Sequence, residues 1–374
     1  MDVLVVAGEA SGDAHAAEVV TALQRRAPGV RFFGMGGPKL EARGVELLYG
    51  AHELSVMGFT EVLPRVPRIL RVLQGLTDAA RARRPKVALL VDVPDFNLRL
   101  AARLKALGIS VVYYVAPMAW AWREGRTRTL ARLVDTLCCI LPFEEAFFRE
   151  RGVNAVYVGN PTVEQLPPPA APAHFRAALG LPPSEGPVLA VLPGSRRGEI
   201  NRIAPTLAAA AAQVVASRTG TQVLIPVAPG LDEAFVAAPF LAAGLQPRLI
   251  AGRAPEVVGA ADVALVTSGT ATLEAGLMRR PLVCVYRASA LNYLLGRALV
   301  RLPFFCLVNL LAGRRVVPEL LQGDATATRI CAELEPLWAG EARASMLLGL
   351  EAVRTSLGEA GAAERVAQRL ATAL

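Results

Sequence analysis

The chain has 374 residues, of which 53% are hydrophobic and 19% charged, and its formal net charge is +8. This length fits two α/β domains better than one core, and the hydrophobic content excludes an intrinsically disordered chain. Only three of the 40 basic residues are lysines; this bias fits a GC-rich genome, or attraction to anionic lipid and phosphate. The basic residues are scattered without a nucleic-acid-binding signature, so we expect no nucleic-acid partner.

Cysteine and histidine spacing argues against disulfides and metal sites. The five cysteines form no C-x-x-C pair and lie in apolar runs, as buried thiols do in a reducing compartment. No two of the three histidines have metal-ligand spacing, so we expect no metal. The chain passes from Met1-Asp2 directly into an apolar strand, so we expect no signal peptide. No apolar run reaches the roughly 20 residues that span a bilayer. We therefore expect a cytoplasmic protein that touches a membrane at most peripherally.

In the first part of the chain, short apolar runs alternate with helical patterns. The expected strands are Val3–Ala7, Arg31–Phe33, Val87–Val91, Ser110–Val115, Thr136–Ile140 and Val156–Val158. The expected helices are Ala14–Arg26, Leu98–Leu107 and Phe143–Glu150. This rhythm predicts a parallel sheet covered on both faces, and we assign residues 1–165 to an N-terminal Rossmann-like domain.

A proline-rich stretch follows, and then a second alternating series. Residues 166–187 are expected to form a stiff linker. We expect a second Rossmann-like domain over 188–340, with strands Val188–Val191, Gln222–Val227, Arg248–Ile250, Val263–Val266 and Leu282–Val285 and helices from Glu199, over Pro255–Gly259 and over Thr272–Met278. The alanine-rich tail 341–374 reads as helical. Two doubly wound α/β domains should bind a ligand at the carboxyl ends of their strands, in the cleft between them.

Two loops of the second domain join a strand to a helix and suit a diphosphate. They are Leu192-Pro-Gly-Ser-Arg-Arg-Gly-Glu199 and Thr267-Ser-Gly-Thr-Ala-Thr-Leu-Glu274. Free N–H groups and a partial positive charge at each helix N-terminus favour an anion. Arg196 adds a bidentate cation, and Glu274 could accept hydrogen bonds from ribose hydroxyls. The pair of loops predicts a nucleotide-diphosphate site, whose expected residues are Gly194, Ser195, Arg196, Ser268, Gly269, Thr270 and Glu274.

Glycine-rich loops of the first domain do not match a known nucleotide motif. Gly8-Glu-Ala-Ser-Gly-Asp13 is not G-x-G-x-x-G, and no P-loop sequence occurs, so a dehydrogenase or P-loop enzyme is disfavoured. Gly34-Met-Gly-Gly-Pro38 is either a tight turn or a loop that, like the first one, leaves space for a bulky acceptor. We expect Glu9 and Ser11 to contact that acceptor.

The sequence Asp92-Val-Pro-Asp-Phe-Asn97 follows an expected strand. Asp92 therefore lies at the strand end, where open sheets place catalytic groups. An acceptor hydroxyl attacks only when a base takes its proton, and we expect Asp92 to be that base. The alternative is that Asp92 only caps the loop. Asp95 is placed to cap the next helix. Trp120, Trp122 and Arg123 lie in the loop that follows another expected strand. Indole rings stack on sugar rings and an arginine pairs with phosphate, so we expect these residues to contact the acceptor. The alternative is that the aromatic rings only fill the cleft between the domains.

Two segments mix apolar residues with arginines. In 56–73, Arg65, Arg68 and Arg71 recur at three-residue spacing, which is typical of an amphipathic helix in a lipid interface or of a core helix with a solvated face. Segment 292–315 should pack mostly inside, although Asn309 could reach the cleft.

Taken together, these motifs resemble the lipid-A-disaccharide synthases. The matching stretches, in order, are Gly8–Asp13, Val56–Gly58, Asp92–Asn97, Trp120–Arg123, Leu141–Glu144, Leu192–Arg196, Ser268–Glu274 and Asn309–Leu311. The resemblance covers residues 3 to about 322, and it implies a GT-B glycosyltransferase without a cofactor. It also implies that the last helices, 341–374, pack back on the N-terminal domain. The same resemblance makes a homodimer an open alternative to a monomer.

The implied reaction joins UDP-2,3-diacylglucosamine to 2,3-diacylglucosamine 1-phosphate, giving a β-1,6 disaccharide and UDP at the inner face of the cytoplasmic membrane. The resemblance implies that Asp92 and Arg196 are essential, and that Glu274 and Asn309 bind on the nucleotide side. Because lysines are so few, Arg123 or Arg126 would have to bind the acceptor phosphate. The alternatives are a UDP-N-acetylglucosamine epimerase, a peptidoglycan glycosyltransferase, or a non-catalytic protein that binds lipid surfaces.

Overall fold

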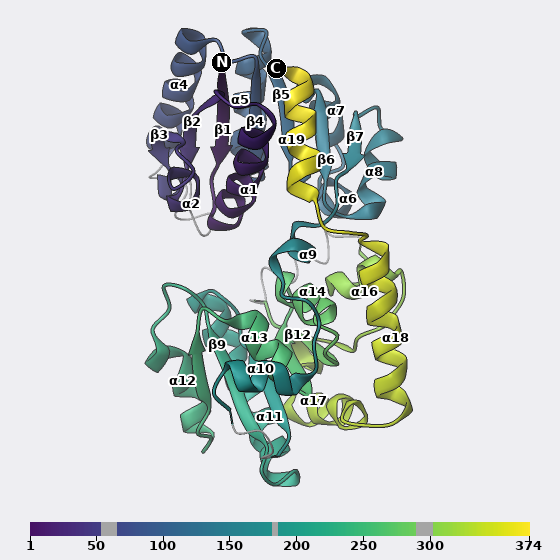
Figure 1. The fold of residues 1–374 in the computed structure, drawn as a ribbon. Helices are drawn as coiled ribbons and strands as arrows, with labels where there is room; N and C mark the ends of the chain where they lie inside the picture. The colour runs from purple at the N-terminus through teal and green to yellow at the C-terminus, as the bar shows by residue number, and fades with distance from the viewer. Residues whose placement is uncertain (54–65, 182–185, 289–301) are drawn as a thin grey trace. The chain divides into compact units, whose positions relative to one another are not determined.

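The computed structural model describes residues 1–53, 66–181, 186–288 and 302–374. The chain divides into two compact units (Figure 1). Unit 1 contains residues 1–164 and 359–374, and unit 2 contains residues 165–358.

Unit 1 is built on a parallel sheet of seven strands, in the order β3-β2-β1-β4-β5-β6-β7. The strands are β1 Asp2–Ala7, β2 Arg31–Gly36, β3 Glu46–Gly50, β4 Val87–Val91, β5 Ser110–Tyr114, β6 Thr136–Cys139 and β7 Ala155–Tyr157. The helices are α1 Ala10–Arg26, α2 Pro38–Glu41, α4 Val66–Arg83, α5 Pro94–Ala106, α6 Ala119–Trp122, α7 Arg126–Leu133, α8 Pro142–Arg149 and α19 Ala362–Ala373, with the 3₁₀ turn η1 Ala51–Glu53. Helix α9 Pro161–Gln165 spans the boundary between the units.

The central strands of unit 1, β1, β4 and β5, are buried on both faces, which explains their continuous apolar sequences. One face packs against α4, α5 and α7 in a core that includes Tyr113. The other face packs against α1 and α19 in a core that includes Tyr114. Successive residues of a strand point to opposite faces, so these neighbouring tyrosines serve different cores.

Unit 2 is built on a second parallel sheet, in the order β10-β9-β8-β11-β12-β13. Its strands are β8 Val188–Leu192, β9 Gln222–Val227, β10 Arg248–Ala251, β11 Val263–Thr267, β12 Leu282–Tyr286 and β13 Glu319–Leu321. Its helices are α10 Pro172–Ala178, α11 Arg197–Ser217, α12 Glu233–Ala242, α13 Ala254–Ala260, α14 Thr270–Leu277, α16 Leu307–Ala312, α17 Ala327–Leu334 and α18 Glu341–Ser356, with the 3₁₀ turns η3 Gln322–Asp324 and η4 Glu335–Leu337.

The proline-rich stretch after unit 1 is more than the stiff linker that its composition predicts. It contains α10, which packs against α13. The Phe175 ring is buried, and a Cβ on Gly259 would come within 2.6 Å of it. Arg176 pairs with Asp262 at 2.7 Å. These contacts hold α10 in unit 2.

The tail does not return to the N-terminal domain as a whole. Helix α18 packs against α14 and α16 within unit 2. Only α19 packs beside α1 in unit 1 (Figure 1), where Glu364 pairs with Arg25 and Arg26. Both helices were expected on the N-terminal domain because the family resemblance implied it; their alanine-rich sequences do not show which core covers each apolar face.

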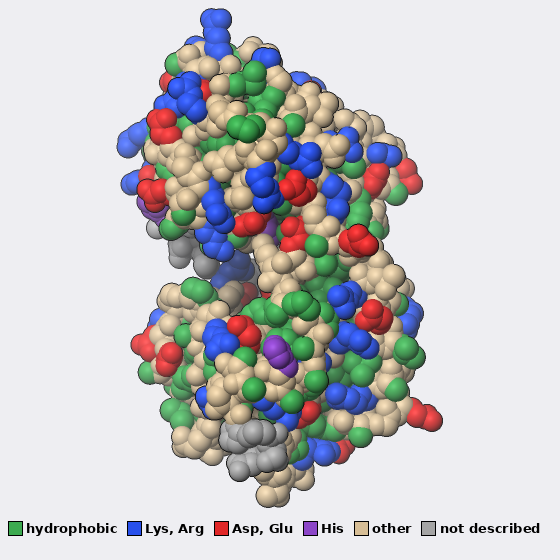
Figure 2. Space-filling view, in the orientation of Figure 1, with side chains coloured by type: hydrophobic (Ala, Val, Ile, Leu, Met, Phe, Trp, Pro, Cys, Tyr) green, Lys and Arg blue, Asp and Glu red, His purple; other side chains and the backbone are tan. Residues whose placement is uncertain are grey.

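The expected elements occur, with shifted ends. Helices α1 and α5 begin earlier than expected, at Ala10 and Pro94; proline is favoured at the first turn of a helix because it lacks the N–H that would be unpaired there. Sequence analysis missed β3, α12, β13 and α17. Among the described residues, no helix has the length and apolar content that a bilayer crossing requires. On the face drawn in Figure 2, Lys and Arg lie among Asp and Glu.

Candidate active site

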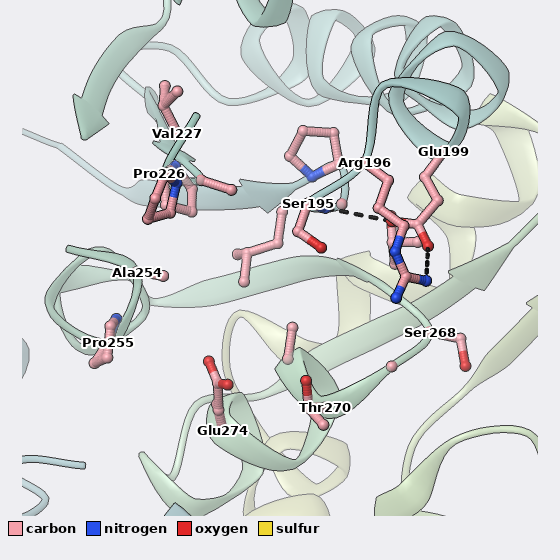
Figure 3. Close-up of a pocket in the computed structure, with 18 of the residues that line it drawn as sticks. Ser195, Arg196, Glu199, Pro226, Val227, Ala254, Pro255, Ser268, Thr270 and Glu274 are labelled. Atoms are coloured by element: carbon pink, nitrogen blue, oxygen red, sulfur yellow. Dashed lines mark hydrogen bonds and ion pairs between the residues drawn. The ribbon is translucent and has the colours of Figure 1, made fainter. Parts of the chain in front are cut away.

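A cavity of about 480 Å³ lies at the carboxyl ends of the unit 2 strands (Figure 3). The loops that follow β8, β9, β10 and β11 form its walls. It is lined by Leu192–Arg196, Glu199, Pro226–Pro229, Gly252, Ala254, Pro255, Thr267–Ala271 and Glu274. All seven residues that the two loops predicted for the nucleotide-diphosphate site line it. The two loops lie side by side because the strands before them, β8 and β11, are neighbours in the sheet.

The first loop presents Ser195 and Arg196 at the start of α11. Gly194 has φ 116°, a backbone conformation that favours glycine, and a Cβ there would lie 2.8 Å from Glu199 Oε2 and displace that side chain. The Ser195 N–H donates to Glu199 Oε2 at 3.3 Å, and Arg196 Nη1 lies 3.5 Å from Glu199 Oε1. In Figure 3 the Glu199 carboxylate lies on the groups that should hold an anion.

The second loop opens α14, and its glycine has φ 156°. The Ser268 hydroxyl donates to the Phe305 carbonyl at 3.0 Å. Thr270 and Glu274 point into the cavity (Figure 3). Burial raises the pKa of the Glu274 carboxyl above its usual range. The arrangement therefore combines two helix N-termini, a guanidinium and an acceptor carboxyl around one space.

Asn309 does not line this cavity, contrary to the sequence prediction. It is fully buried. Its Nδ2 donates to Val317 O at 2.8 Å and to Glu319 Oε1 at 2.7 Å, and its Oδ1 accepts from the Val316 and Val317 N–H groups at 2.7 and 2.8 Å. All the donors and acceptors of this amide are used, so Asn309 ties α16 to β13.

Glu319 extends this network toward the cavity. Its carboxylate accepts from the Phe305 and Cys306 N–H groups at 2.9 and 3.1 Å. Phe305 in turn accepts from Ser268, which lines the cavity. Asn309 is thus connected to the Ser268 loop through Glu319 and Phe305.

In unit 1, Asp92 follows the last residue of β4, at the carboxyl edge of the sheet. Asp92 and Val93 have φ 52° and 42°, a left-handed conformation that is strained for non-glycine residues, above all a β-branched one. Burial, and then the nearby Glu9, raise the pKa of the Asp92 carboxyl. A carboxyl with a raised pKa at a strand end is typical of a general base.

The residues predicted for an acceptor lie in three places in unit 1. Arg123 and Arg126 both pair with the exposed Asp95, and both guanidinium groups lie over the Trp122 ring, at 4.2 and 5.6 Å. Asp95 is thus an ion-pair partner and does not cap α5 with its side chain.

Trp120 lies at the second place and is partly buried. Its Nε1 donates to Glu144 Oε1 at 2.9 Å, and its ring packs edge-on to Phe143. Burial raises the pKa of Glu144 to about 7. Trp120 therefore fits the alternative that the sequence left open, in which the indole ring packs against other side chains. Trp122 does not fit it, because this residue is 42% exposed.

Glu9 and Ser11 are exposed at the start of α1. Glu9 lies close enough to Asp92 to affect the pKa of that carboxyl. The buried Asp13 accepts from the Gly37, Lys39 and Leu40 N–H groups at 2.7, 3.0 and 3.2 Å. It therefore joins the two glycine-rich loops of this edge.

Several residues of these sites were missed from the sequence. Glu199 and the Pro226–Pro229 wall line the cavity, and Tyr113 contacts Asp92. Pro226–Pro229 could have been found from its place at the end of an expected strand. Glu199 and Tyr113 carry no such signal, because their roles depend on which loop or strand lies beside them.

The sequence model of the lipid-A-disaccharide synthetase family matches residues 3–368. The chain belongs to this family. A lipid-A-disaccharide synthase of Myxococcus xanthus strain DK1622 is 59% identical over 98% of this chain and 96% of its own length. One from Anaeromyxobacter sp. strain K is 54% identical over the same shares. The family makes this chain a glycosyltransferase of lipid A disaccharide synthesis, acting on lipid-linked sugars.

Solved structures similar to this family member share its GT-B fold at low identity. A UDP-GlcNAc 2-epimerase from Neisseria meningitidis, bound to UDP-GlcNAc, has a TM-score of 0.66 at 14% identity, covering 100% of both chains. A calicheamicin glycosyltransferase has a TM-score of 0.62 at 17% identity, covering 100% of this chain and 98% of its own. Epimerases and transferases thus share this architecture, and the distinction between them comes from the family and the site.

Proposed function

We propose that the chain transfers 2,3-diacylglucosamine from UDP to the 6-hydroxyl of 2,3-diacylglucosamine 1-phosphate, with inversion, giving the β-1,6 disaccharide 1-phosphate and UDP. The observation that carries this proposal is the unit 2 cavity. In it, two helix N-termini, the Arg196 guanidinium and the Glu274 carboxyl line one space of about 480 Å³, which suits a nucleotide diphosphate.

The donor's diphosphate binds at Ser195 and at Ser268–Thr270. Negative charge grows on this group as the sugar leaves, and fixed N–H groups with Arg196 stabilise it without reorganising. Glu274 accepts from ribose hydroxyls. The apolar wall of Pro226–Pro229 packs against the base. No metal is assigned a role, because the guanidinium and the helix termini supply the positive charge.

Asp92 takes the proton from the acceptor hydroxyl, which attacks the anomeric carbon on the side opposite UDP. Its raised pKa brings the basicity of the carboxylate closer to that needed for this transfer. Glu9, Ser11 and Asp95 contact the acceptor sugar. An acceptor phosphate would compete with Asp95 for Arg123 and Arg126, and Trp122 would stack on the sugar. Trp120 supports this loop.

Membrane contact belongs to the same proposal, since both substrates carry acyl chains. Val66 and Leu70 on α4 are 40% and 45% exposed, beside the exposed Arg71. We propose that this end of α4 meets the cytoplasmic face of the inner membrane. Residues 56–65 of the predicted amphipathic segment, with Arg65, and residues 292–301 of the second lie outside the described residues. A homodimer also stays a proposal.

The test measures UDP release with the two acylated sugars, singly and together. We expect release only when both are present, and we expect Asp92→Asn to lower turnover by about 10²–10⁴-fold while UDP affinity is kept. Asp78→Asn, which changes an exposed carboxyl on α4 that pairs with Arg81, is the control and should retain wild-type turnover. Interconversion of a single UDP-sugar would support the epimerase alternative, and binding without release the non-catalytic one. An Asp92→Asn variant with wild-type turnover would contradict the role of Asp92.

A further inference from the structure

The main-chain carbonyl of Asp92 is held by two buried side chains. Tyr113 Oη donates to it at 2.5 Å from β5, and Asn97 Nδ2 donates to it at 2.8 Å from α5. Tyr113 and Asn97 are both fully buried. A buried donor that leaves its acceptor has no water to replace it, so these two bonds fix the direction of the carbonyl.

The backbone at this point needs such support. Asp92 and Val93 are both left-handed, and the neighbouring strand ends in the same way at Val115, with φ 67°. The Asp92 N–H donates to Tyr114 O at 3.0 Å. Conformations of this kind persist only where the surroundings hold them. The bend is therefore held at its N–H by the β5 backbone and at its carbonyl by Tyr113 and Asn97.

The backbone torsions of Asp92 decide where its carboxyl group lies. We propose that Tyr113 is a positioning residue for Asp92: its hydroxyl, together with the Asn97 amide, keeps the Asp92–Val93 bend closed and the carboxyl in place for proton transfer. This inference rests on the proposed role of Asp92 as the base. Tyr113 itself touches neither substrate in this account.

Tyr113 also fills the core between the sheet and its covering helices, so the test must separate the hydroxyl from the ring. Tyr113→Phe keeps the ring and removes only the donor. The matched control is Tyr114→Phe, which removes a hydroxyl from the next residue of β5. Tyr114 belongs to the core on the other face of the sheet, edge-on to His15.

We expect Tyr113→Phe to lower kcat by about 10- to 100-fold, because a small displacement of a catalytic group has effects of this size. The UDP Kd and the acceptor KM should stay within about twofold of wild type. Tyr114→Phe should keep kcat within about twofold. Asn97→Ser, which removes the other donor, should reproduce the pattern of Tyr113→Phe.

The pH profile distinguishes positioning from general loss of structure. Burial raises the pKa of Asp92, and the charged groups around Asp92 and Tyr113 are Glu9, Asp95 and Arg126. An open bend would hydrate the Asp92 carboxyl and lower its pKa, so the acid limb of kcat/KM should move to lower pH in Tyr113→Phe. Loss of kcat with an unmoved acid limb and a lower urea midpoint would overturn the inference.

Wild-type kcat in Tyr113→Phe would overturn it as well. If the wild-type protein releases no UDP from the two acylated sugars, the proposed function fails instead. That outcome is seen before any variant is made, so the two failures are distinguishable.

Discussion

Asn309 offers the sharpest contrast between a ligand-binding and a scaffold role. The family resemblance implies a role on the nucleotide side, whereas in the structure its amide is fully buried and joins α16 to β13. We predict that Asn309→Ala destabilises unit 2 and leaves UDP affinity within a few-fold of wild type. The small effect on UDP comes through Glu319 and the loop of Ser268.

The magnitude follows from the contacts that are lost. Alanine removes three bonds to main-chain groups and one to the Glu319 carboxylate. It leaves the Val316 and Val317 N–H groups without a partner. Bonds between neutral groups contribute about 1 kcal/mol each and one to a charged group about 1.5–3 kcal/mol. We therefore expect a loss of roughly 5 kcal/mol.

The assay is urea unfolding followed by Trp338 fluorescence. The chain has three tryptophans, and Trp338 is the one in unit 2, so the two in unit 1 are changed to phenylalanine in every sample. Asn201→Ala is the control, because Asn201 is exposed on α11. It should change the unfolding free energy by less than about 0.5 kcal/mol. An unchanged midpoint in Asn309→Ala with a large loss of UDP affinity would refute the scaffold role.

Three further predictions concern the charged and apolar surfaces of the sites. Glu199→Gln should raise UDP affinity several-fold in calorimetry, since a carboxylate then no longer contacts the Ser195 N–H and the Arg196 guanidinium. Equal or weaker affinity would contradict this. Glu9→Gln should move the acid limb of kcat/KM to lower pH, because Glu9 raises the pKa of Asp92 and activity is lost as pH falls through that pKa; a limb that stays in place would show that Glu9 does not act on the base. Val66→Ser with Leu70→Ser should reduce flotation with anionic vesicles, and undiminished flotation would move the membrane contact away from α4.

Local patterns predicted most of the fold. Apolar runs bounded by glycine and proline marked strands such as β4 and β8, because a strand buried on both faces must be apolar throughout. The strands that were missed, β3 and β13, carry mixed sequences and are only partly buried. They lie at sheet edges, where the physical requirement on sequence is weaker.

The two loops that line the unit 2 cavity were also predictable, because each loop carries its own signal. A strand followed by Pro-Gly-Ser-Arg or Ser-Gly-Thr already specifies a tight turn into a helix N-terminus. The acceptor side was less predictable. Arg123 was expected to be free for phosphate, yet it pairs with Asp95, which lies on a different helix.

The sequence alone determined the alternation of strands and helices, the two strand-to-helix loops of the unit 2 cavity, the strand-end carboxyl and the family, since each is written in neighbouring residues. Tertiary structure decided which side chains and helices meet. The Glu199 carboxylate accepts from the Ser195 N–H, Asn309 joins α16 to β13, and the Tyr113 hydroxyl donates to the Asp92 carbonyl. It also placed α18 and α19 in different units. The physical reason is that hydrophobic periodicity identifies a buried face but not its partner. A polar side chain shows its role only when the donor or acceptor beside it is known.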